Sequence, residues 1–499
     1  MPEKSNYYQP ELTLPDLLNR AILIHPELYI GYVNEGGNLT TRTYSDLLGD
    51  ARQIASGLFN LGLKQGDKVI IATRYNQETI ELLWGSFLLG VVPTILQPPM
   101  TFSGYNPSVV KLMDVSAQLN SPFIFLSEEV KDTGNLPAEK IMHKELLDCS
   151  GSYPVPSLNP GDLAFIQFSS GSTGNPKGIM LTHETIMVNL DAIRIGLDLH
   201  YPDHVGNWMP LFHDMGLIGY HLTPLYCIAF QYQIETIDFI MKPGLWLNLM
   251  SEQKITISGC TNFALALVLR YLKRNKTAPG WNFSSMKALL NGAEPISVKI
   301  MQEFVEALAP SGFRPEAMMP VYGMAEATLA ISFTPLMQPS VITAFHATLL
   351  DRESIAKPVD PSDLSARLLS GVGIALNDIR IRIVDEYDLP VKEGNSGQIQ
   401  LSGASITKGY YNKPEATTAA FCGEWLRTGD IGFFFDSNLF ISGRQKDIIF
   451  KNGRNYFAND LETMACTLDE ISYGKVCFGA CEDLENGRDN VIVLSLIHI

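Results

Sequence analysis

Basic residues are scarce in this sequence of 499 residues, with 37 lysines and arginines against 53 aspartates and glutamates. The formal net charge of −16 argues against duplex DNA or RNA as a partner, because proteins that bind duplexes usually present a basic surface. A long hydrophobic run is also missing, since the longest one, 82–96, is too short for a transmembrane helix and contains Pro93. Residues 1–13 lack the hydrophobic core of a secretion signal. We therefore expect no membrane span and no nucleic-acid partner.

Cysteine is infrequent as well. The seven cysteines form no CxxC pair, and Cys477 and Cys481 have no histidine at the spacing of a metal site. Reduced, structural thiols are the simplest interpretation, which favours a cytoplasmic location.

The composition, 46% hydrophobic and 18% charged, is that of a globular protein with more than one domain or subdomain. Strand and helix patterns alternate through most of the chain, which favours an α/β fold with mostly parallel sheets. The expected helices are 16–24, 44–61 after the capping residue Thr43, and one from Asn76 through 81–90. The expected strands are 67–73, 91–96, 123–126, 163–168 and 255–259.

The pattern changes after about residue 370. Strand-rich stretches at 379–386, 396–403 and 433–443 predict a β-rich subdomain over 371–445, and a helix at 459–468 and a strand at 475–480 follow. We expect an N-terminal domain over 1–445, with two α/β subdomains up to about 370 and the β-rich subdomain behind them. Residues 446–499 would form a small, incomplete α+β domain.

The strongest single motif is a loop of small residues after a predicted strand that ends at Phe168. Glycines permit close approach to a phosphate, hydroxyl and N–H groups can bind its oxygens, and Lys177 supplies positive charge. A Walker loop is excluded by Pro176 and Gly178, which flank the lysine. The predicted phosphate-binding residues are Ser169, Ser170, Gly171, Ser172, Thr173, Gly174 and Lys177.

Five further motifs follow in order: NWMPLFHDMGLIG (207–219), NGAEP (291–295), YGMAE (322–326), WLRTGDIG (425–432) and GRQKD (443–447). Together with SSGSTGNPKG (169–178), this series resembles the adenylate-forming superfamily of acyl-CoA synthetases, luciferases and nonribosomal adenylation domains. Six motifs in the right order are very specific. The resemblance implies an enzyme that uses ATP and Mg²⁺ to activate a carboxylic acid.

The same resemblance implies a role for each motif residue. Lys177, Glu326 and Arg444 would be catalytic, Glu326 would bind Mg²⁺, and Lys446 would lie at a hinge. Tyr322 would stack on adenine, and Asp430, in a turn, would bind the ribose hydroxyls. Without the resemblance, Glu326 would be interpreted as a solvated surface charge and Tyr322 as a core aromatic residue. An ordinary aspartate turn would be an equally good interpretation of Asp430. The remaining nucleotide-binding residues would be Gly292, Ala293, Glu294, Gly323, Met324 and Ala325.

The acid would bind near PLFHDMG, where His213 is interpreted as a pocket residue rather than a general base or a core histidine. The aspartate that amino-acid-activating domains reserve for a substrate ammonium has no counterpart, which favours a fatty or other uncharged acid. The predicted contacts with the acid are Trp208, His213, Asp214, Met215, Gly216, Asn262 and Phe263.

One departure from the family is Ala325, where most members have threonine; Thr328 could substitute for it or not. The segments YGMAEATL, GCTNFALAL and GVVPTILQPP resemble those of the fatty acyl-AMP ligase branch. Enzymes of that branch pass the acyl group to a carrier-protein phosphopantetheine. That branch has an extra segment after the Tyr-Gly motif. Residues 333–369 would contain this segment; the alternative is that they form an ordinary surface loop. An acyl-CoA ligase and a catalytically impaired acyl-adenylate-binding module remain alternatives.

In this family a larger domain with a late catalytic lysine follows the hinge. Only residues 447–499 follow it here, without a Gly-Lys motif. We therefore expect either a piece of a longer polypeptide, such as a multidomain synthase, or an altered end, and slow adenylation.

Overall fold

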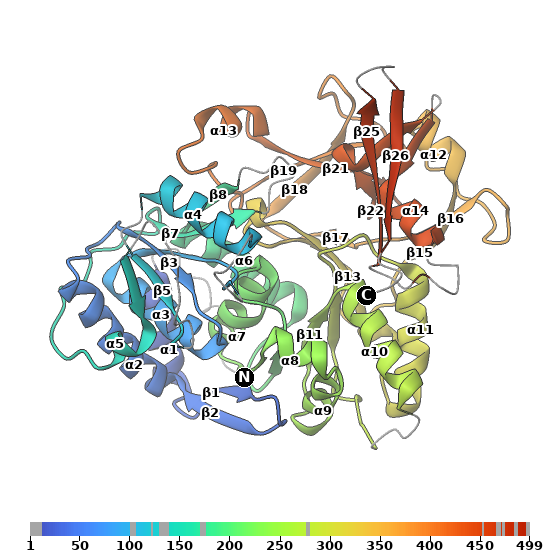
Figure 1. Cartoon of the computed structure of the whole chain (residues 1–499). Coiled ribbons are helices and arrows are strands. Elements are labelled where there is room, and N and C mark those ends of the chain that lie inside the picture. The colour runs from blue at the N-terminus through green and yellow to red at the C-terminus, as the bar shows by residue number, and fades with distance from the viewer. Residues whose placement is uncertain are drawn as a thin grey trace. The chain divides into compact units, whose positions relative to one another are not determined.

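The structure is a computed structural model (Figure 1) that describes residues 12–99, 106–120, 123–128, 139–169, 176–275, 280–451, 454–465, 471, 475–483 and 488–495. The chain divides into two compact units, each built from three segments. The first unit contains 1–258, 324–330 and 404–419, and the second contains 259–323, 331–403 and 420–499. The domain boundary predicted at residue 445 stays a prediction.

The first unit has the predicted alternation of strands and helices. Its helices are α1 (Leu14–Ile24), α2 (Tyr44–Asn60), α3 (Asn76–Leu89), α4 (Pro107–Leu119), α5 (His143–Leu147), α6 (His183–Leu197), η1 (Met215–Leu222), α7 (Thr223–Tyr226), α8 (Thr236–Met241), α9 (Gly244–Glu252), η4 (Ala325–Ala327) and α13 (Pro414–Ala420). Its strands are β1 (Tyr29–Val33), β2 (Leu39–Thr43), β3 (Lys68–Ala72), β4 (Val92–Ile95), β5 (Phe123–Leu126), β6 (Glu139–Met142), β7 (Leu163–Ser169), β8 (Lys177–Thr182), β9 (His204–Asn207) and β10 (Phe230–Ile234).

The sheets of this unit are mostly parallel, as predicted. One has the order β4-β3-β5-β6 and is entirely parallel. In another, β9, β10 and β1 are parallel and β2 is antiparallel to β1. Strands β7 and β8 form an antiparallel pair in which Ser169 lies opposite Lys177.

Local signals in the sequence account for the ends of the helices. Helix α2 begins after Thr43, whose hydroxyl accepts a hydrogen bond from the Asp46 N–H at 3.1 Å while the Asp46 carboxylate accepts one from the Thr43 N–H at 2.9 Å. Helix α3 ends at Gly90, whose φ of +73° suits glycine at a helix C-terminus. The predicted helices at 44–61 and from Asn76 are thereby confirmed.

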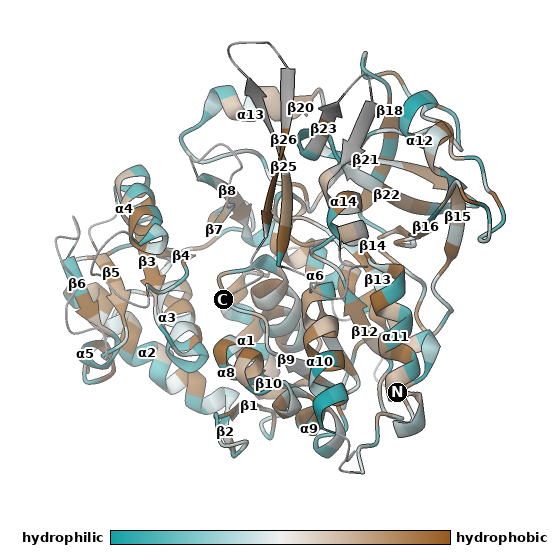
Figure 2. Ribbon diagram, turned by 45° about the vertical axis from the view of Figure 1, so that its right-hand side comes forward, coloured by the Kyte–Doolittle hydropathy of each residue, from teal (hydrophilic) through white to brown (hydrophobic). Residues whose placement is uncertain are grey.

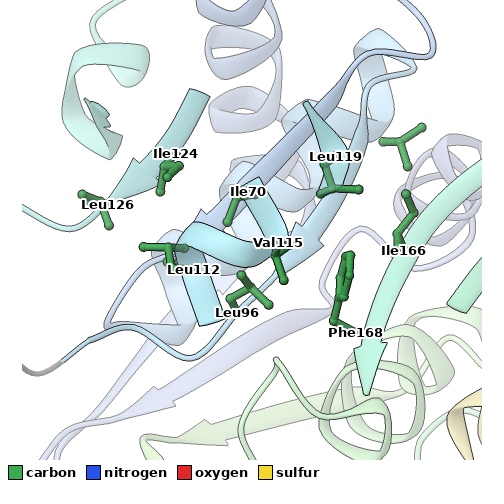
Figure 3. Packing of buried hydrophobic residues seen from close by; sticks show 11 residues of the cluster. Ile70, Leu96, Leu112, Val115, Leu119, Ile124, Leu126, Ile166 and Phe168 are labelled. Carbon is green, nitrogen blue, oxygen red and sulfur yellow. The ribbon is translucent and has the colours of Figure 1, made fainter. Parts of the chain in front are cut away.

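A buried hydrophobic cluster fixes the strand that leads to the predicted phosphate loop (Figure 3). Ile166 and Phe168 of β7 pack with Leu112 and Val115 of α4 and with Ile70 of β3. The Thr94 hydroxyl of β4 donates a hydrogen bond to the Ile166 carbonyl at 3.0 Å. The end of β7 is therefore held by a rigid core, which is a suitable support for a binding loop.

The second unit contains the β-rich part of the chain. Its helices are α10 (Asn262–Arg274), α11 (Val298–Leu308), η2 (Ala309–Ser311), η3 (Pro315–Ala317), α12 (Ala347–Glu353), η5 (Gln445–Asp447) and α14 (Ala458–Ala465). Its strands are β11 (Ile257–Cys260, which begins in the first unit), β12 (Ala288–Asn291), β13 (Met318–Gly323), β14 (Ala330–Phe333), β15 (Ile342–His346), β16 (Ala366–Ser370), β17 (Ile374–Ala375), β18 (Ile379–Val384), β19 (Gly397–Gly403), β20 (Phe421–Cys422), β21 (Trp425–Phe435), β22 (Asn438–Arg444), β23 (Ile448–Lys451), β24 (Arg454–Phe457), β25 (Val476–Asp483) and β26 (Arg488–Ser495).

These strands form one mixed sheet and several antiparallel ones. In the order β17-β14-β13-β12-β11, strands β12 and β13 are parallel. The order β18-β19-β21-β20, with β22 paired to β21, is antiparallel and confirms the strands predicted after residue 371. Helix α11 is amphipathic (Figure 2), because its residues Val298, Met301, Phe304 and Leu308 recur on one buried face.

The predicted extra segment, 333–369, is organised rather than a plain surface loop. Strand β15 precedes α12 in the sequence and β16 follows it, and the two strands pair antiparallel. Arg367 of β16 binds Asp351 of α12 through both carboxylate oxygens, at 2.7 and 2.6 Å. Whether it is the insertion of the fatty acyl-AMP ligase branch stays a prediction.

In the part of the chain that the structure describes, no helix combines the length and the apolar character needed to cross a bilayer.

Candidate active site

The predicted phosphate loop joins two paired strands. Ser169 ends β7, and Lys177 begins β8 directly opposite it. Residues 170–175 lie outside the described residues, so the predictions for Ser170, Gly171, Ser172, Thr173 and Gly174 stay predictions, as does any role of the Ser169 hydroxyl.

Tyr410 connects the two predicted catalytic residues of the first unit. The Lys177 ammonium lies 5.0 Å from the centroid of the Tyr410 ring, a cation–π contact. On the other side, the Tyr410 hydroxyl donates a hydrogen bond to Glu326 Oε1 at 3.0 Å. Burial, together with the Glu326 carboxylate, raises the pKa of Tyr410, so the phenol stays a neutral donor. The Lys177 ammonium, the Tyr410 phenol and the Glu326 carboxylate therefore lie in a row in space.

The segment that carries Tyr410 is bound to the free edge of β8. The Met180 N–H donates to the Gly409 carbonyl at 3.1 Å, and the Tyr411 N–H donates to the Gly178 carbonyl at 2.7 Å. Because β7 pairs with the opposite edge, β8 is held on both sides close to Lys177. Tyr410 is a functional candidate that the sequence reasoning missed. The only local signal is an aromatic residue after glycine, and its relation to Lys177 and Glu326 depends on three separate chain segments.

Glu326 lies in η4, just beyond the end of β13, and its carbonyl accepts a hydrogen bond from the Thr407 N–H at 2.8 Å. Within the described ranges, no group of three His, Cys, Asp or Glu side chains could hold a metal by itself. A single carboxylate nevertheless fits Mg²⁺, which often takes one protein carboxylate together with substrate phosphates and water. The residues present are thus compatible with an ion that a nucleotide brings.

Thr328 does not replace the threonine missing at Ala325. It is fully buried, with a φ of +68°, and its hydroxyl donates to the Ser405 carbonyl at 2.8 Å. The hydroxyl is therefore used within the fold and does not face a ligand.

The PLFHDMG motif ends in a π-helix, η1, a rare element that is frequent at functional sites. The His213 imidazole lies 2.7 Å from the Asp214 carboxylate, whose Oδ1 also accepts the Met215 N–H at 2.7 Å. Burial lowers the pKa of His213, but the hydrogen bond and charge of Asp214 outweigh it and raise the pKa. The His213 side chain is 49% exposed, so the core-histidine alternative is wrong.

Gly216 occurs where no larger residue fits. A methyl group on its α-carbon would overlap the Pro210 carbonyl oxygen and approach the Met209 carbonyl oxygen to 2.9 Å. The start of η1 is thus packed directly against the backbone of the preceding loop. Met215, beside it, is buried.

Trp208 is buried in an aromatic cluster of the first unit. Its ring stacks on Phe239 with a centroid distance of 4.2 Å, and its carbonyl accepts the Thr236 hydroxyl at 2.8 Å. The cluster gives this region an apolar interior, while contact between Trp208 and an acid stays a prediction.

In the second unit, Asp430, the predicted ribose residue, contacts both Tyr322, predicted to stack on adenine, and Arg444, predicted to be catalytic. The Tyr322 hydroxyl donates to Asp430 Oδ2 at 2.5 Å, and Arg444 Nε donates to Oδ1 at 2.9 Å. Burial and the Asp430 carboxylate raise the pKa of Tyr322, while Asp430 outweighs burial in raising the pKa of Arg444. The structure brings these three residues together.

The prediction that Asp430 lies in a turn is wrong, because the residue belongs to β21. The strand contains a bulge there: Gln398 pairs with Ile431 and Gln400 with Arg427, so three residues of β21 lie opposite one of β19. Gly429 in the bulge has a φ of +76°, and the Asp430 N–H binds the Thr428 hydroxyl at 3.0 Å. The bulge aims the Asp430 side chain at Tyr322.

The NGAEP loop follows β12 and is held by Asn262. The Asn262 side chain is fully buried, donates to the Pro295 carbonyl at 2.5 Å and accepts the Ser297 N–H at 3.1 Å. Ala293 has a φ of +66°, a strained conformation that clusters at functional sites. Asn262 therefore shapes the loop, and its contact with an acid stays a prediction.

The remaining predicted residues lie at element ends. Gly292 packs against Val321, where a side chain on its α-carbon would approach Val321 Cγ2 to 2.8 Å. Phe263 is the second residue of α10 and is 38% exposed, and Lys446 lies exposed in η5. Glu294 follows β12, Gly323 ends β13, Met324 follows it and Ala325 begins η4, and their binding roles stay predictions.

Comparison with known proteins gives consistent matches. The family "AMP-binding enzyme" matches residues 27–411. A Caulobacter vibrioides protein with the provisional name of acyl-CoA synthetase is 31% identical over 90% of this chain and 80% of its own length. A Teredinibacter turnerae medium-chain-fatty-acid–[acyl-carrier-protein] ligase, TtuA, is 31% identical over 76% of this chain and 63% of its length. A solved structure from a study of fatty acyl-adenylate ligases of E. coli and L. pneumophila aligns with a TM-score of 0.88 at 28% identity, covering 96% and 87% of the two chains.

Proposed function

Because the chain belongs to the AMP-binding enzyme family and is an acid–AMP ligase, we propose that its substrate is a fatty or other uncharged carboxylic acid and that its acyl acceptor is a carrier-protein phosphopantetheine. The observation that carries the adenylation chemistry is the row formed by Lys177, Tyr410 and Glu326. It offers positive charge and a carboxylate on either side of one fixed phenol.

In the first step, a carboxylate oxygen of the acid attacks the α-phosphorus of ATP. The bond from that phosphorus to the bridging oxygen breaks, and pyrophosphate leaves with the electron pair. Lys177 neutralises phosphate charge, and Tyr410 orients Glu326. Mg²⁺ bound at Glu326 would add positive charge to the phosphates.

In this proposal, the residues around Asp430 bind the nucleoside. Asp430 accepts the ribose hydroxyls, and its hydrogen bond with Tyr322 fixes an aromatic ring on which adenine can stack. Arg444 shares the same carboxylate and presents further N–H donors to ribose or phosphate.

An uncharged acid is favoured by the state of Asp214. Its Oδ1 accepts the Met215 N–H and contacts His213, so the carboxylate is already partnered and is a poor site for a substrate ammonium. The name of the T. turnerae relative, a medium-chain fatty acid ligase for a carrier protein, supports both the acid and the acceptor.

In the second step, the phosphopantetheine thiol attacks the acyl carbonyl, a thioester forms, and AMP leaves with the electrons of the broken C–O bond. The test offers the protein ATP, Mg²⁺ and a mixture of carboxylic acids and identifies the acyl-adenylate by mass spectrometry. We expect fatty acyl-adenylates and pyrophosphate release. Amino-acyl-adenylates alone would contradict the proposal.

An acyl-CoA ligase is the second candidate, since the C. vibrioides relative carries that name. Purified acyl-AMP is then supplied with either free CoA or a holo-carrier protein, and the thioester product is measured. Transfer to the carrier supports the proposed acceptor, and transfer to CoA alone replaces it. Hydroxamate formation from ATP, fatty acid and hydroxylamine would exclude the third alternative, an impaired acyl-adenylate-binding module.

A further inference from the structure

Side chains add hydrogen bonds to the backbone of the π-helix η1. Its wide turns pair backbone groups five residues apart, as the Thr223 N–H does with the Ile218 carbonyl, and side chains donate to carbonyls of the same helix. The Thr223 hydroxyl donates to the Ile218 carbonyl at 2.7 Å, and Gln233 Nε2 of β10 donates to the Tyr220 carbonyl at 3.1 Å. The shape of η1 is therefore coupled to residues on neighbouring elements.

His221, near the end of η1, belongs to a directional chain of hydrogen bonds. The Trp84 indole can only donate, and it donates to His221 Nε2 at 2.8 Å. His221 Nδ1 must then carry the proton, which it donates to Gln231 Oε1 at 2.9 Å. Gln231 Nε2 donates to the Tyr44 hydroxyl at 2.9 Å, which donates to the Ala229 carbonyl at 3.1 Å.

A second branch extends from β10 to the loop beneath Gly216. Gln233 Nε2 also donates to Gln231 Oε1 at 3.4 Å, and its own Oε1 accepts Asn207 Nδ2 at 2.8 Å. Asn207 binds both backbone groups of Met209, at 2.8 and 3.0 Å. The Met209 carbonyl is one of the two that leave no room for a side chain at Gly216.

These side chains, Trp84, His221, Gln231, Gln233, Asn207 and Tyr44, are named the buried network. All six are at most 1% exposed. Burying amides and an imidazole is costly unless each polar atom is bonded, so a hydrophobic core of the same size would be the simpler way to gain stability. A satisfied polar network instead specifies one geometry. Burial lowers the pKa of His221 to about 4, which keeps the imidazole neutral in its single tautomer.

We infer that the buried network is a positioning device that holds η1 in its π-helical form and thereby sets which acyl chains the enzyme accepts. The inference rests on the proposed function and on the prediction that Met215 and Gly216 of η1 contact the acid. Without the network, η1 can relax toward tighter α-helical turns, and the register of Met215 and Gly216 changes.

The test compares variants that remove single bonds with a matched control. Gln233→Met removes the donor to the Tyr220 carbonyl, and Tyr44→Phe removes the hydroxyl at the end of the chain. The control Tyr29→Phe deletes a hydroxyl that pairs with Tyr232 in the same unit but outside the buried network. The measurements are KM for a series of fatty acids, KM for ATP, and hydrogen exchange of the amides in 215–222.

We expect KM for the preferred acid to rise about five- to tenfold in Gln233→Met, the preferred chain length to change, and KM for ATP to stay within about twofold. Exchange in 215–222 should accelerate in both variants and not in the control. His221→Gln, which keeps a hydrogen-bonding group, should lie between wild type and His221→Phe.

The wild type could be active while neither Gln233→Met nor Tyr44→Phe changes the chain-length preference or the hydrogen exchange of 215–222. That result would overturn the inference and leave the proposed function standing. Equal increases in KM for acid and ATP would also overturn it, because they indicate a general structural effect. A wild type that forms no adenylate from any acid would instead refute the proposed function, and the inference with it.

Discussion

The Lys177 ammonium is the charged group that β8 holds beside the predicted phosphate loop. We predict that Lys177→Met lowers kcat/KM for adenylation by about 10²- to 10³-fold, because charge that stabilises the transition state is lost. Pyrophosphate release measures the rate. The exposed Lys64→Met is the control, and a loss below about threefold for Lys177→Met would contradict the assigned role.

Tyr410 offers a more specific test at the same scale. Tyr410→Phe keeps the ring beside Lys177 but removes the hydrogen bond to Glu326. We expect the Mg²⁺ concentration for half-maximal rate to rise and the rate to fall about tenfold, since a charge-assisted hydrogen bond orients the carboxylate. The neighbouring Tyr411→Phe, whose ring faces Lys68 instead, is the matched control. An unchanged Mg²⁺ dependence of the rate would show that Tyr410 has no role in Mg²⁺ binding.

Residues such as Lys177, Glu326 and Asp430 could be selected as candidates because each belongs to a short motif of distinctive composition. Tyr410 could not, since its role follows from contacts among 177, 326 and 410, which the fold alone brings together. The same holds for Asn262, whose amide groups bind residues 295 and 297. A side chain that acts through backbone partners leaves no local pattern.

The elements α2, α3, β3 and β7 could be predicted from capping residues and hydrophobic periodicity. The π-helix η1 could not, because its sequence, MGLIGYHL, is mostly apolar and shows no period that distinguishes wide from normal turns. The bulge at Asp430 escaped prediction for a related reason. A Thr-Gly-Asp sequence is typical of turns, and the strand is revealed only by the pairing of Asp430 with Arg444 of β22 and by the bulge opposite β19.

The close packing of Gly216 in η1 leads to a prediction for the stability of the protein. Gly216→Ala should lower the free energy of unfolding by about 1–3 kcal/mol, because the added methyl group overlaps backbone that cannot move aside cheaply. Urea unfolding followed by circular dichroism measures the change. Gly219→Ala is the control, since its methyl group would meet only the flexible Leu329 side chain at 3.2 Å, and equal losses in both variants would contradict the explanation.

The pH dependence of stability concerns the whole chain, and Glu235 is its most testable source. Burial raises the pKa of Glu235 to about 7 from 4.5, although a hydrogen bond from the Asn76 N–H opposes the shift. A carboxyl group whose pKa is raised by folding binds more protons when folded, so its ionisation costs stability. That cost is absent below pH 4.5, grows between pH 4.5 and 7, and is constant above pH 7.

We therefore predict that Glu235→Gln, which keeps the acceptor for Asn76, is more stable than wild type by about 2–3 kcal/mol at pH 8 and equal to it at pH 4.5. Urea midpoints at several pH values measure the difference. The exposed Glu252→Gln should follow the wild type at every pH. A constant difference across this range would show that the effect is not ionisation.

The two compact units share the chain in alternating segments, and this order has a consequence during synthesis. The first unit lacks its last segment until Ala419 has left the ribosome, about 160 residues after Ser258. At roughly 5–20 residues per second, that interval lasts on the order of 10–30 s. During it the edge of β8 has no Gly409–Tyr411 segment beside it, so the nascent chain presents an unpaired strand edge to chaperones until that segment emerges.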